Sequence, residues 1–318
     1  MARLSRRAFL GTSAAVGLTG SRLLSATEAD IARKRQFTID LVCGAIGVRA
    51  DQRKAIGLAV QHGFESVQPQ PEFLAKLSRA ELDDLRGGLK ARNLVWGASG
   101  LPVDFRRDEA TFKEGMKRLP ALAAGLARAG ATRVGTWLRP SHRELTYRAN
   151  FAQHARRLRD VSRVLADHGQ RFGMEYVGPK TSWASGRHSF IHTMAEAKEL
   201  VAAIGQDGVG LVLDSWHWYT AGETETDLLS LASSDVVACD LNDAPAGIAV
   251  DEQMDLRREL PGATGVIDLA TFLGALVKIG YNGPIRAEPF NQPLRDMPAD
   301  QAVAATAAAM RKAFALVE

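Results

Sequence analysis

The chain has 318 residues, of which 46% are hydrophobic and 24% are charged, and this is the composition of a globular protein. Its 40 basic and 36 acidic residues give a formal net charge of +4, with no run of five basic residues. This pattern predicts no nucleic-acid partner, and the two cysteines exclude a disulfide scaffold and a CxxC zinc module.

The first 29 residues have the pattern of an export signal. Ser5-Arg6-Arg7-Ala8-Phe9-Leu10 resembles the twin-arginine signal, and a mildly apolar stretch follows over residues 8–18. This stretch is shorter than the roughly 20 residues that a membrane-spanning helix needs. We therefore expect a twin-arginine signal peptide at 1–29, a linker at 30–35, no stable membrane span, and export to the periplasm by the twin-arginine export machinery. The alternative is a frayed basic tail.

From residue 36 onward, short runs rich in β-branched residues alternate with longer segments of helical periodicity. Strands are predicted at Phe37–Cys43, Phe64–Gln68, Leu94–Ser99, Arg133–Trp137, Phe172–Tyr176, Val209–Asp214, Val236–Leu241 and Ile285–Glu288. Helices are predicted at Lys54–His62, Ala80–Arg92, Thr111–Ala129, Glu144–His168, Met194–Ile204, Leu269–Ile279 and Asp300–Val317. Several helices are followed by a glycine, which is typical of a left-handed helix stop.

This strict alternation predicts a parallel sheet with right-handed crossovers. Eight strand–helix units over a length near the typical ~250 residues favour a single (β/α)₈ TIM barrel at 36–318. The alternative is an open doubly wound sheet. Its usual nucleotide-binding loops, G-x-G-x-x-G and G-x-x-x-x-G-K-[ST], do not occur in the sequence.

Each of the last four predicted strands ends in an acidic residue: Glu175, Asp214, Asp240 and Glu288. Barrel enzymes carry their catalytic groups at these strand ends. Unpaired carboxylates cannot stay charged in an apolar barrel mouth, and four together would repel one another. One divalent cation would neutralise part of their charge, and carboxylate oxygens suit Mg²⁺ or Mn²⁺. Any one acid alone is equally consistent with a helix cap or a salt bridge, and Asp243 is a candidate for such a cap.

These acids stand in motifs that resemble the xylose isomerase-like barrel superfamily, the group of sugar phosphate isomerases and epimerases and of endonuclease IV. The motifs span roughly residues 36–318 and are Gly173-Met-Glu175, Leu213-Asp214-x-x-His217, Asp240-Leu-Asn-Asp243, Leu260-Pro-Gly262-x-x-Gly265-x-Ile-Asp268 and Ala287-Glu288-Pro. The resemblance implies that Glu175, Asp214, Asp240 and Glu288 bind one divalent metal. It also implies that His217 contacts a substrate oxygen.

One position departs from the family pattern. The strand-seven residue that is commonly His in the family is Asp240 here. An all-oxygen ligand set favours Mn²⁺ or Mg²⁺, with Co²⁺ or Zn²⁺ as the poorer options. Four carboxylates would also leave a surplus of negative charge around a divalent ion. Alternatively, Asp240 is not a ligand and the metal site is weakened or lost.

Four further side chains are candidates for substrate binding. Trp137 ends strand four, where a ring can stack on a sugar, and His188 lies in the long loop after strand five. Gln68 ends strand two, and Arg257 precedes a Pro-Gly turn together with Arg258. One of these two arginines is expected to reach the site, and we take Arg257. Each candidate also has an ordinary structural explanation, in the core or in solvent. The two cysteines are expected to be separate free thiols.

The resemblance implies that Glu175 and Glu288 are an acid/base pair that moves a proton beside a carbonyl, through an enediolate. Such chemistry isomerises, epimerises or eliminates a β-leaving group, and the sequence does not choose among them. Export argues against a sugar phosphate, so we expect a free sugar, keto-sugar, inositol or glycoside. The alternatives are a nuclease and a non-catalytic sugar-binding barrel with a decayed metal site. The sequence is compatible with a homo-oligomer and does not determine the oligomeric state.

Overall fold

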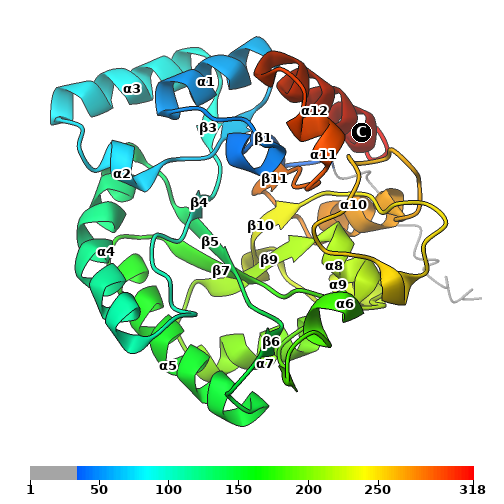
Figure 1. Cartoon of the computed structure of the whole chain (residues 1–318). Helices are drawn as coiled ribbons and strands as arrows, with labels where there is room; N and C mark the ends of the chain where they lie inside the picture. Colours follow the sequence, from blue (N-terminus) through cyan, green and yellow to red (C-terminus); the bar gives the residue numbers. More distant parts are fainter. Residues whose placement is uncertain (1–33) are drawn as a thin grey trace, which may run out of the picture. The chain divides into compact units, whose positions relative to one another are not determined.

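The computed structural model of the chain describes residues 34–318. The expected signal peptide at 1–29 and most of the expected linker at 30–35 lie outside the described residues. Within 34–318, a ring of parallel strands is surrounded by helices (Figure 1). The predicted fold class, a TIM barrel, is confirmed.

The main sheet consists of β1 (Thr38–Leu41), β2 (Ser66–Val67), β3 (Val95–Trp96), β4 (Ser99–Gly100), β5 (Arg133–Trp137), β7 (Arg171–Glu175), β9 (Val209–Asp214), β10 (Val236–Asp240) and β11 (Pro284–Arg286). The strand order is β3-β2-β1-β11-β10-β9-β7-β5-β4, with parallel pairing throughout. Only Gly97 and Ala98 separate β3 from β4 in the chain. The third predicted strand therefore supplies both ends of this order, and the chain itself closes the ring.

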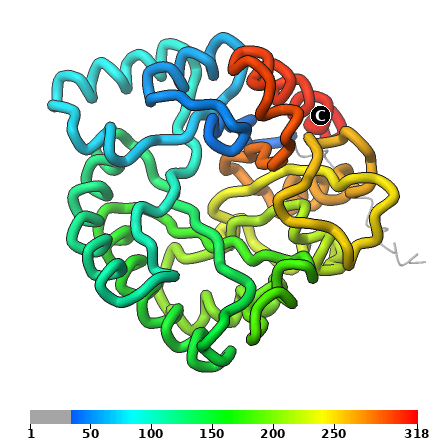
Figure 2. The backbone as a smooth tube through the Cα atoms, viewed as in Figure 1, coloured from blue at the N-terminus to red at the C-terminus, as the bar shows by residue number. Residues whose placement is uncertain are grey.

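The helices are α1 (Gln52–Gln61), α2 (Pro71–Leu74), α3 (Arg79–Ala91), α4 (Glu109–Ala129), α5 (Tyr147–Ala166), α6 (Lys180–Trp183), α7 (Met194–Ile204), α8 (Ser215–Thr220), α9 (Glu225–Leu229), α10 (Leu269–Lys278), α11 (Gln292–Arg295) and α12 (Ala299–Phe314). The loops also hold the 3₁₀ turns η1 (Cys43–Ile46), η2 (Ser233–Asp235) and η3 (Val250–Glu252), and the short strands β6 (Ser141–His142) and β8 (His188–Ser189). Figure 2 shows the blue start of the described chain beside its orange and red end, in agreement with the pairing of β1 with β11.

Side-chain caps set the starts of the long helices. Residues that accept a hydrogen bond from the backbone N–H three positions on are Asp51, Ser78, Asp108, Thr193 and Asp268. Helix α5 begins at Tyr147, later than its predicted start at Glu144, because Thr146 caps it. The N–H groups of Glu144 and Leu145 donate instead to His142 Nδ1, which holds the preceding turn.

Small side chains line the inside of the barrel below the carboxyl ends of its strands. Ala98, Val212 and Ala238 form a buried cluster separate from the main core. A Cβ atom at Gly135 or Gly173 would lie 3.1 or 3.0 Å from Val212 Cγ2, which is closer than most Cβ contacts. This layer leaves space that larger branched residues would fill in other barrels.

Two expectations from composition can be compared with the described residues. Cys43 and Cys239 are both buried free thiols, as predicted, and burial raises the pKa of the Cys43 thiol to about 11. Among residues 34–318, no helix has the length and apolar character to cross a bilayer.

Candidate active site

A cavity of about 590 Å³ opens at the carboxyl ends of the strands. Its lower wall contains the small residues Ala98, Gly135 and Ala238, and its upper wall contains charged and aromatic side chains. Such a volume lies within the range of small-molecule sites, which is about 300–1,000 Å³. The sequence places this cavity where a TIM barrel carries its chemistry.

Four carboxylates meet in this cavity. Glu175 ends β7, Asp214 ends β9, Asp240 ends β10, and Glu288 follows β11. One oxygen from each lies within 4.8 Å of those from the other three. The structure therefore brings together all four residues that the sequence singled out as metal ligands.

Burial and mutual repulsion perturb these acids. Burial raises the pKa of Glu175 well above its ordinary value, and the nearby charges of Asp240 and Glu288 raise it further. Burial raises the pKa of Glu288 to about 7, although the guanidinium of Arg286 opposes the shift. Glu175 Oε1 is buried and has no hydrogen-bond partner among residues 34–318. A bound cation is one partner that could satisfy this buried carboxylate oxygen.

Two arginines enter the same cluster. Arg258 Nη1 lies 2.7 Å from Asp214 Oδ2, and its Nη2 lies 2.7 Å from Asp255 Oδ1. Arg286 holds both oxygens of Asp240, with Nη2 at 2.8 Å from Oδ2 and Nε on Oδ1. The two guanidinium groups offset part of the charge of the four carboxylates, but Arg258 is shared with a fifth carboxylate, Asp255. A surplus of negative charge therefore remains beside a divalent ion.

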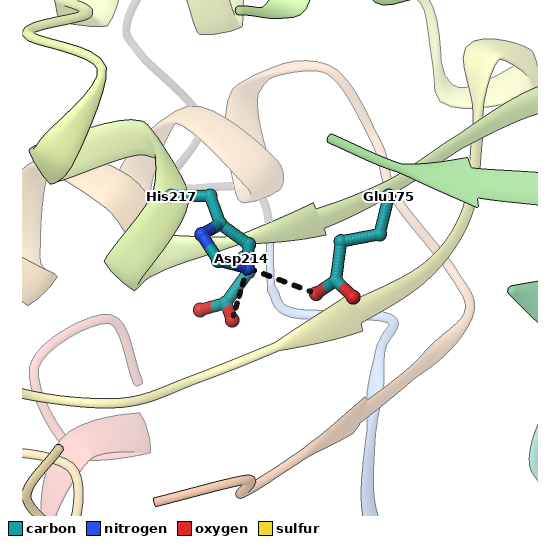
Figure 3. Close-up of side chains that lie close together, drawn as sticks. All are labelled: Glu175, Asp214 and His217. Atoms are coloured by element: carbon teal, nitrogen blue, oxygen red, sulfur yellow. Dashed lines mark ion pairs between the residues drawn. The ribbon is translucent and has the colours of Figure 1, made fainter. Parts of the chain in front are cut away.

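His217 lies between the carboxylates of Glu175 and Asp214 (Figure 3). Its Nε2 atom is 3.8 Å from Glu175 Oε1 and 3.8 Å from Asp214 Oδ2. Asp214 caps α8 by accepting from the N–H of Trp216, and the i,i+3 spacing places the imidazole over this carboxylate.

The protonation of His217 follows from its surroundings. Burial lowers the pKa of His217 to about 4, so the ring is neutral near pH 7. Its Nδ1 lies 3.2 Å from the N–H donor of Gly178, and its Nε2 lies 3.2 Å from the guanidinium donor Arg258 Nη2. A neutral imidazole accepts at only one nitrogen, so it can accept only one of these two hydrogen bonds.

The predicted substrate-binding residues are only partly brought to the cavity. Trp137 lines it with a 43% exposed side chain, and the guanidinium of Arg106 stacks 4.3 Å from its ring centroid. Arg257 is exposed and outside the cavity, whereas Arg258 is buried in it, so the choice of Arg257 is wrong. The N–H of Arg258 donates to Pro289 O, and this contact turns Arg258 inward.

Two further candidates lie elsewhere. His188 is in β8, where it pairs with His142 of β6 in the small antiparallel sheet. Gln68 follows β2, and its backbone carbonyl accepts from Gln52 Nε2. Neither side chain lines the cavity, which corrects both expectations.

Four charged residues of the cavity were missed. They are Asp40, Arg106, Asp255 and Arg286. For Arg286 a signal existed, because it alternates with Glu288 and so shares its side of the strand. Asp40 gave a similar signal as a lone charge between Ile39 and Leu41 in an apolar strand.

The donor set fits a divalent cation. Glu175, Asp214 and Glu288 offer oxygens to one point, and Glu175 Oε1 has no other partner within the described chain. Asp214 and Asp240 can contribute only through the lone pairs that Arg258 and Arg286 leave free. A second group of donors, Glu175, Asp214 and His217, meets the same distance limit.

Comparisons with known proteins agree with this arrangement. The chain matches the family described as "Xylose isomerase-like TIM barrel" over residues 56–313. An inosose isomerase of Bacillus velezensis is 25% identical over 260 residues, which cover 79% of this chain and 88% of the relative. The solved structure of a xylose isomerase domain protein from Alicyclobacillus acidocaldarius is 33% identical in sequence and has a TM-score of 0.74. The match covers 86% of this chain and 96% of that protein's chain.

A solved structure of the IolI protein with a bound zinc atom has a TM-score of 0.70 at 21% identity, and the match covers 86% of this chain and 96% of that one. At this identity the likeness shows the fold alone. The inosose isomerases among the relatives support an enzyme of the isomerase or epimerase class.

Proposed function

The chain belongs to the xylose isomerase-like TIM barrel family, and from this premise we propose a divalent-metal-dependent isomerase or epimerase that acts on a free keto-sugar or inositol-like substrate. The observation that carries this proposal is the pair Glu175 and Glu288. Both glutamates line one cavity, both have a raised pKa, and Asp214 lies within 4.8 Å of each.

Glu175, Asp214 and Glu288 would hold the metal, with Asp240 as a further oxygen donor. When bound, such an ion polarises the substrate carbonyl and the adjacent hydroxyl. The raised pKa of Glu175 would fall beside a bound cation, whereas burial already raises the pKa of Glu288 to about 7. We propose Mn²⁺ or Mg²⁺ over Zn²⁺, because every donor in this set is a carboxylate oxygen.

The side chains of the cavity have distinct roles in proton transfer. One glutamate removes the proton from the carbon beside the carbonyl, and the other returns a proton. Return to the opposite face of the same carbon gives an epimer, and return to the neighbouring carbon gives an isomer. His217 contacts a substrate oxygen, and Arg258 holds Asp214 in place by its 2.7 Å contact.

The inositol-like substrate is supported by the inosose isomerase relative and by the cavity. A volume of about 590 Å³ suits one polyhydroxylated ring. The exposed ring of Trp137 offers a surface for the apolar face of such a ring, while its hydroxyl groups reach the charged walls.

We test this proposal by proton exchange in heavy water, followed by NMR of keto-inositol and keto-hexose substrates. The protein is stripped of metal and reloaded with Mn²⁺, Mg²⁺ or Zn²⁺. We expect deuterium to enter the substrate beside its carbonyl, fastest with Mn²⁺ or Mg²⁺. Glu175→Gln and Glu288→Gln should lower the rate at least about 100-fold, as for loss of a general acid or base. The exposed Glu72→Gln is the matched control. Equal exchange with no metal, or in both variants, would contradict the assignment.

We also propose that the protein is exported through the twin-arginine machinery and acts outside the cytoplasm. This rests on Arg6-Arg7 and the apolar stretch that follows them. A substrate without phosphate agrees with this location.

A further inference from the structure

The cavity contains another buried carboxylate, Asp40, that the metal cluster and the acid/base pair do not use. Asp40 is the third residue of β1 and its side chain lines the cavity, while the residue is only 2% exposed. Its Oδ1 atom has no hydrogen-bond partner among residues 34–318. Asp40 forms no ion pair in this part of the chain. Burial raises its pKa to about 6, although hydrogen bonding from Ser66 and Leu41 opposes the shift.

The fold makes room for this carboxylate. A Cβ atom at Gly97 would lie 2.3 Å from Asp40 Oδ1 and 2.5 Å from Oδ2, so only glycine fits against it. Gly97 also stands at the break between β3 and β4, where the third strand leaves its pairing with β2 and joins β5. The place where the ring is interrupted is therefore the place that receives the Asp40 side chain.

The nearest cation in the strand register is already engaged. Asp40 of β1 stands beside Arg286 of β11, and Arg286 in turn stands beside Asp240 of β10. The guanidinium of Arg286 binds both oxygens of Asp240 and lies 3.6 Å from Glu288 Oε1. No hydrogen bond from Arg286 to Asp40 is present among residues 34–318, although its charge lowers the pKa of Asp40.

A buried carboxylate oxygen without a donor is unfavourable, and its persistence in a fold needs an explanation. In a cavity, a bound molecule can supply the missing partner. For Glu175 Oε1 a cation can do this, because three other carboxylates surround it. Asp40 is not in that group of donors, so a single donor brought by the substrate suits its free Oδ1 better than a cation does.

We propose that Asp40 accepts a hydrogen bond from a substrate hydroxyl other than those at the reacting carbons. This inference rests on the proposed function and narrows its substrate class. The substrate must carry a free hydroxyl on the side of β1, beyond the metal-binding carboxylates. A phosphate or a carboxylate there would repel Asp40, and a deoxy or methoxy position would offer no donor.

The experiment compares an inosose (a keto-inositol) with each of its mono-deoxy analogues, on the full chain, its Asp40→Ala variant and its Asp40→Asn variant. We measure deuterium exchange for kcat/KM and calorimetry for binding. Asp40→Ala should lower kcat/KM for the complete inosose about 10- to 100-fold, as for a hydrogen bond to a charged group. With the wild type, kcat/KM for one deoxy analogue should be lower than for the complete inosose by the same factor. With Asp40→Ala, kcat/KM for that analogue should be no lower than for the complete inosose. The exposed Asp84→Asn is the control.

A purely structural role has a different signature. Replacing an unpaired buried carboxylate with Asn should leave Tm unchanged or raise it, while substrate binding weakens. A fall of Tm together with an equal loss for every analogue would overturn the inference, as would additive losses for all deoxy analogues. The wild type could exchange no proton of any inosose and still bind it, with one deoxy analogue binding more weakly than the others. That result would contradict the proposed reaction and support the hydrogen bond from substrate to Asp40. If nothing binds, both fail.

Discussion

Arg286 holds both oxygens of Asp240, and this contact determines what Asp240 can contribute to the site. The Asp240 carboxylate is fully buried, and burial raises its pKa while Arg286 opposes that shift. Together the two side chains carry no net charge. The pair therefore places an oxygen donor near the cluster, and Arg286 offsets part of the repulsion between Asp240 and Glu175.

The first prediction concerns this pair. Arg286→Gln should destabilise the metal-free protein by about 3–5 kcal/mol, because it leaves Asp240 as an uncompensated buried charge. The double variant Asp240→Asn/Arg286→Gln should recover most of that loss. Urea denaturation in the presence of a chelator measures the three variants as a double-mutant cycle. Lys117→Gln, which removes an exposed ion pair with Glu114, is the control and should have little effect. Additive losses would show that the two side chains act independently.

A second buried acid, Glu223, lies outside the catalytic cluster. It accepts from Tyr176 Oη and from the N–H of Met194 at 2.6 Å. Burial raises the pKa of Glu223 to about 7, although both hydrogen bonds oppose the shift. Between its ordinary value of about 4.5 and this raised value, the folded state holds a proton that the unfolded state has lost. Stability must then fall as the pH rises through this window.

Glu223→Gln should remove this pH dependence, because Gln resembles the protonated acid. Relative to the wild type, the variant should gain about 2–3 kcal/mol between pH 5 and pH 8, from a pKa shift of two units or more. Thermal unfolding of both proteins at several pH values measures the difference, in which the titrations of other groups cancel. A constant difference across this range would mean that Glu223 is already ionised in the folded protein.

At the scale of elements, the loop between β10 and α10 positions Arg258 through a single carboxylate. Asp243 Oδ2 accepts from the N–H groups of Thr264 at 2.9 Å and Gly265 at 2.7 Å, and Oδ1 accepts from Ile267 at 3.1 Å. Its backbone pairs with Glu259, the neighbour of Arg258. The sequence suggested a helix cap for Asp243, but the residue fixes the long loop instead.

Asp243→Asn should loosen this loop without unfolding the barrel, because an amide cannot accept all of these N–H groups. Each hydrogen bond to a charged group contributes about 1.5–3 kcal/mol. Amide hydrogen exchange at residues 255–267 should accelerate at least about 10-fold, while the strands keep their protection. Asp268→Asn, in the same loop, is the control, because Asn is as good a helix cap as Asp. Unchanged exchange at 255–267 would assign the loop geometry to other contacts.

The strands and the four acids could be predicted because both depend on local patterns. A short apolar run ends in an acid on each of the last four predicted strands, and parallel strands bring these ends to one mouth. The sequence could not predict that Arg258, and not Arg257, lies in the cavity. The backbone N–H of Arg258 donates to the carbonyl of Pro289, which is distant in the sequence. The interruption of the third predicted strand could not be predicted either. It lies at Gly97, which packs against the side chain of Asp40 from another strand.

At the scale of the whole molecule, the ring closes only when its last strand is in place. β11 lies between β1 and β10, so the strand nearest the C-terminus completes the pairing of the strand nearest the start of the barrel. The site depends on the same closure, because Arg286 and Glu288 come from β11 and the segment after it. The complete chain must therefore be folded before the cluster can hold a metal.

The need for a folded barrel before the metal binds agrees with the proposed export route. The Arg6-Arg7 pattern resembles a twin-arginine signal, and the machinery that reads such signals carries folded proteins. We expect Arg6→Lys/Arg7→Lys to leave the protein in the cytoplasm, folded and with its metal, because the variant changes the signal and not residues 34–318. Cell fractionation, followed by metal analysis and thermal unfolding of the retained protein, measures both parts. Arg3→Lys, outside the pair, is the matched control and should be exported normally. Normal export of the double variant would contradict the assignment. Wild-type export only in an unfolded state would assign the chain to a different route, in which the metal is acquired after crossing.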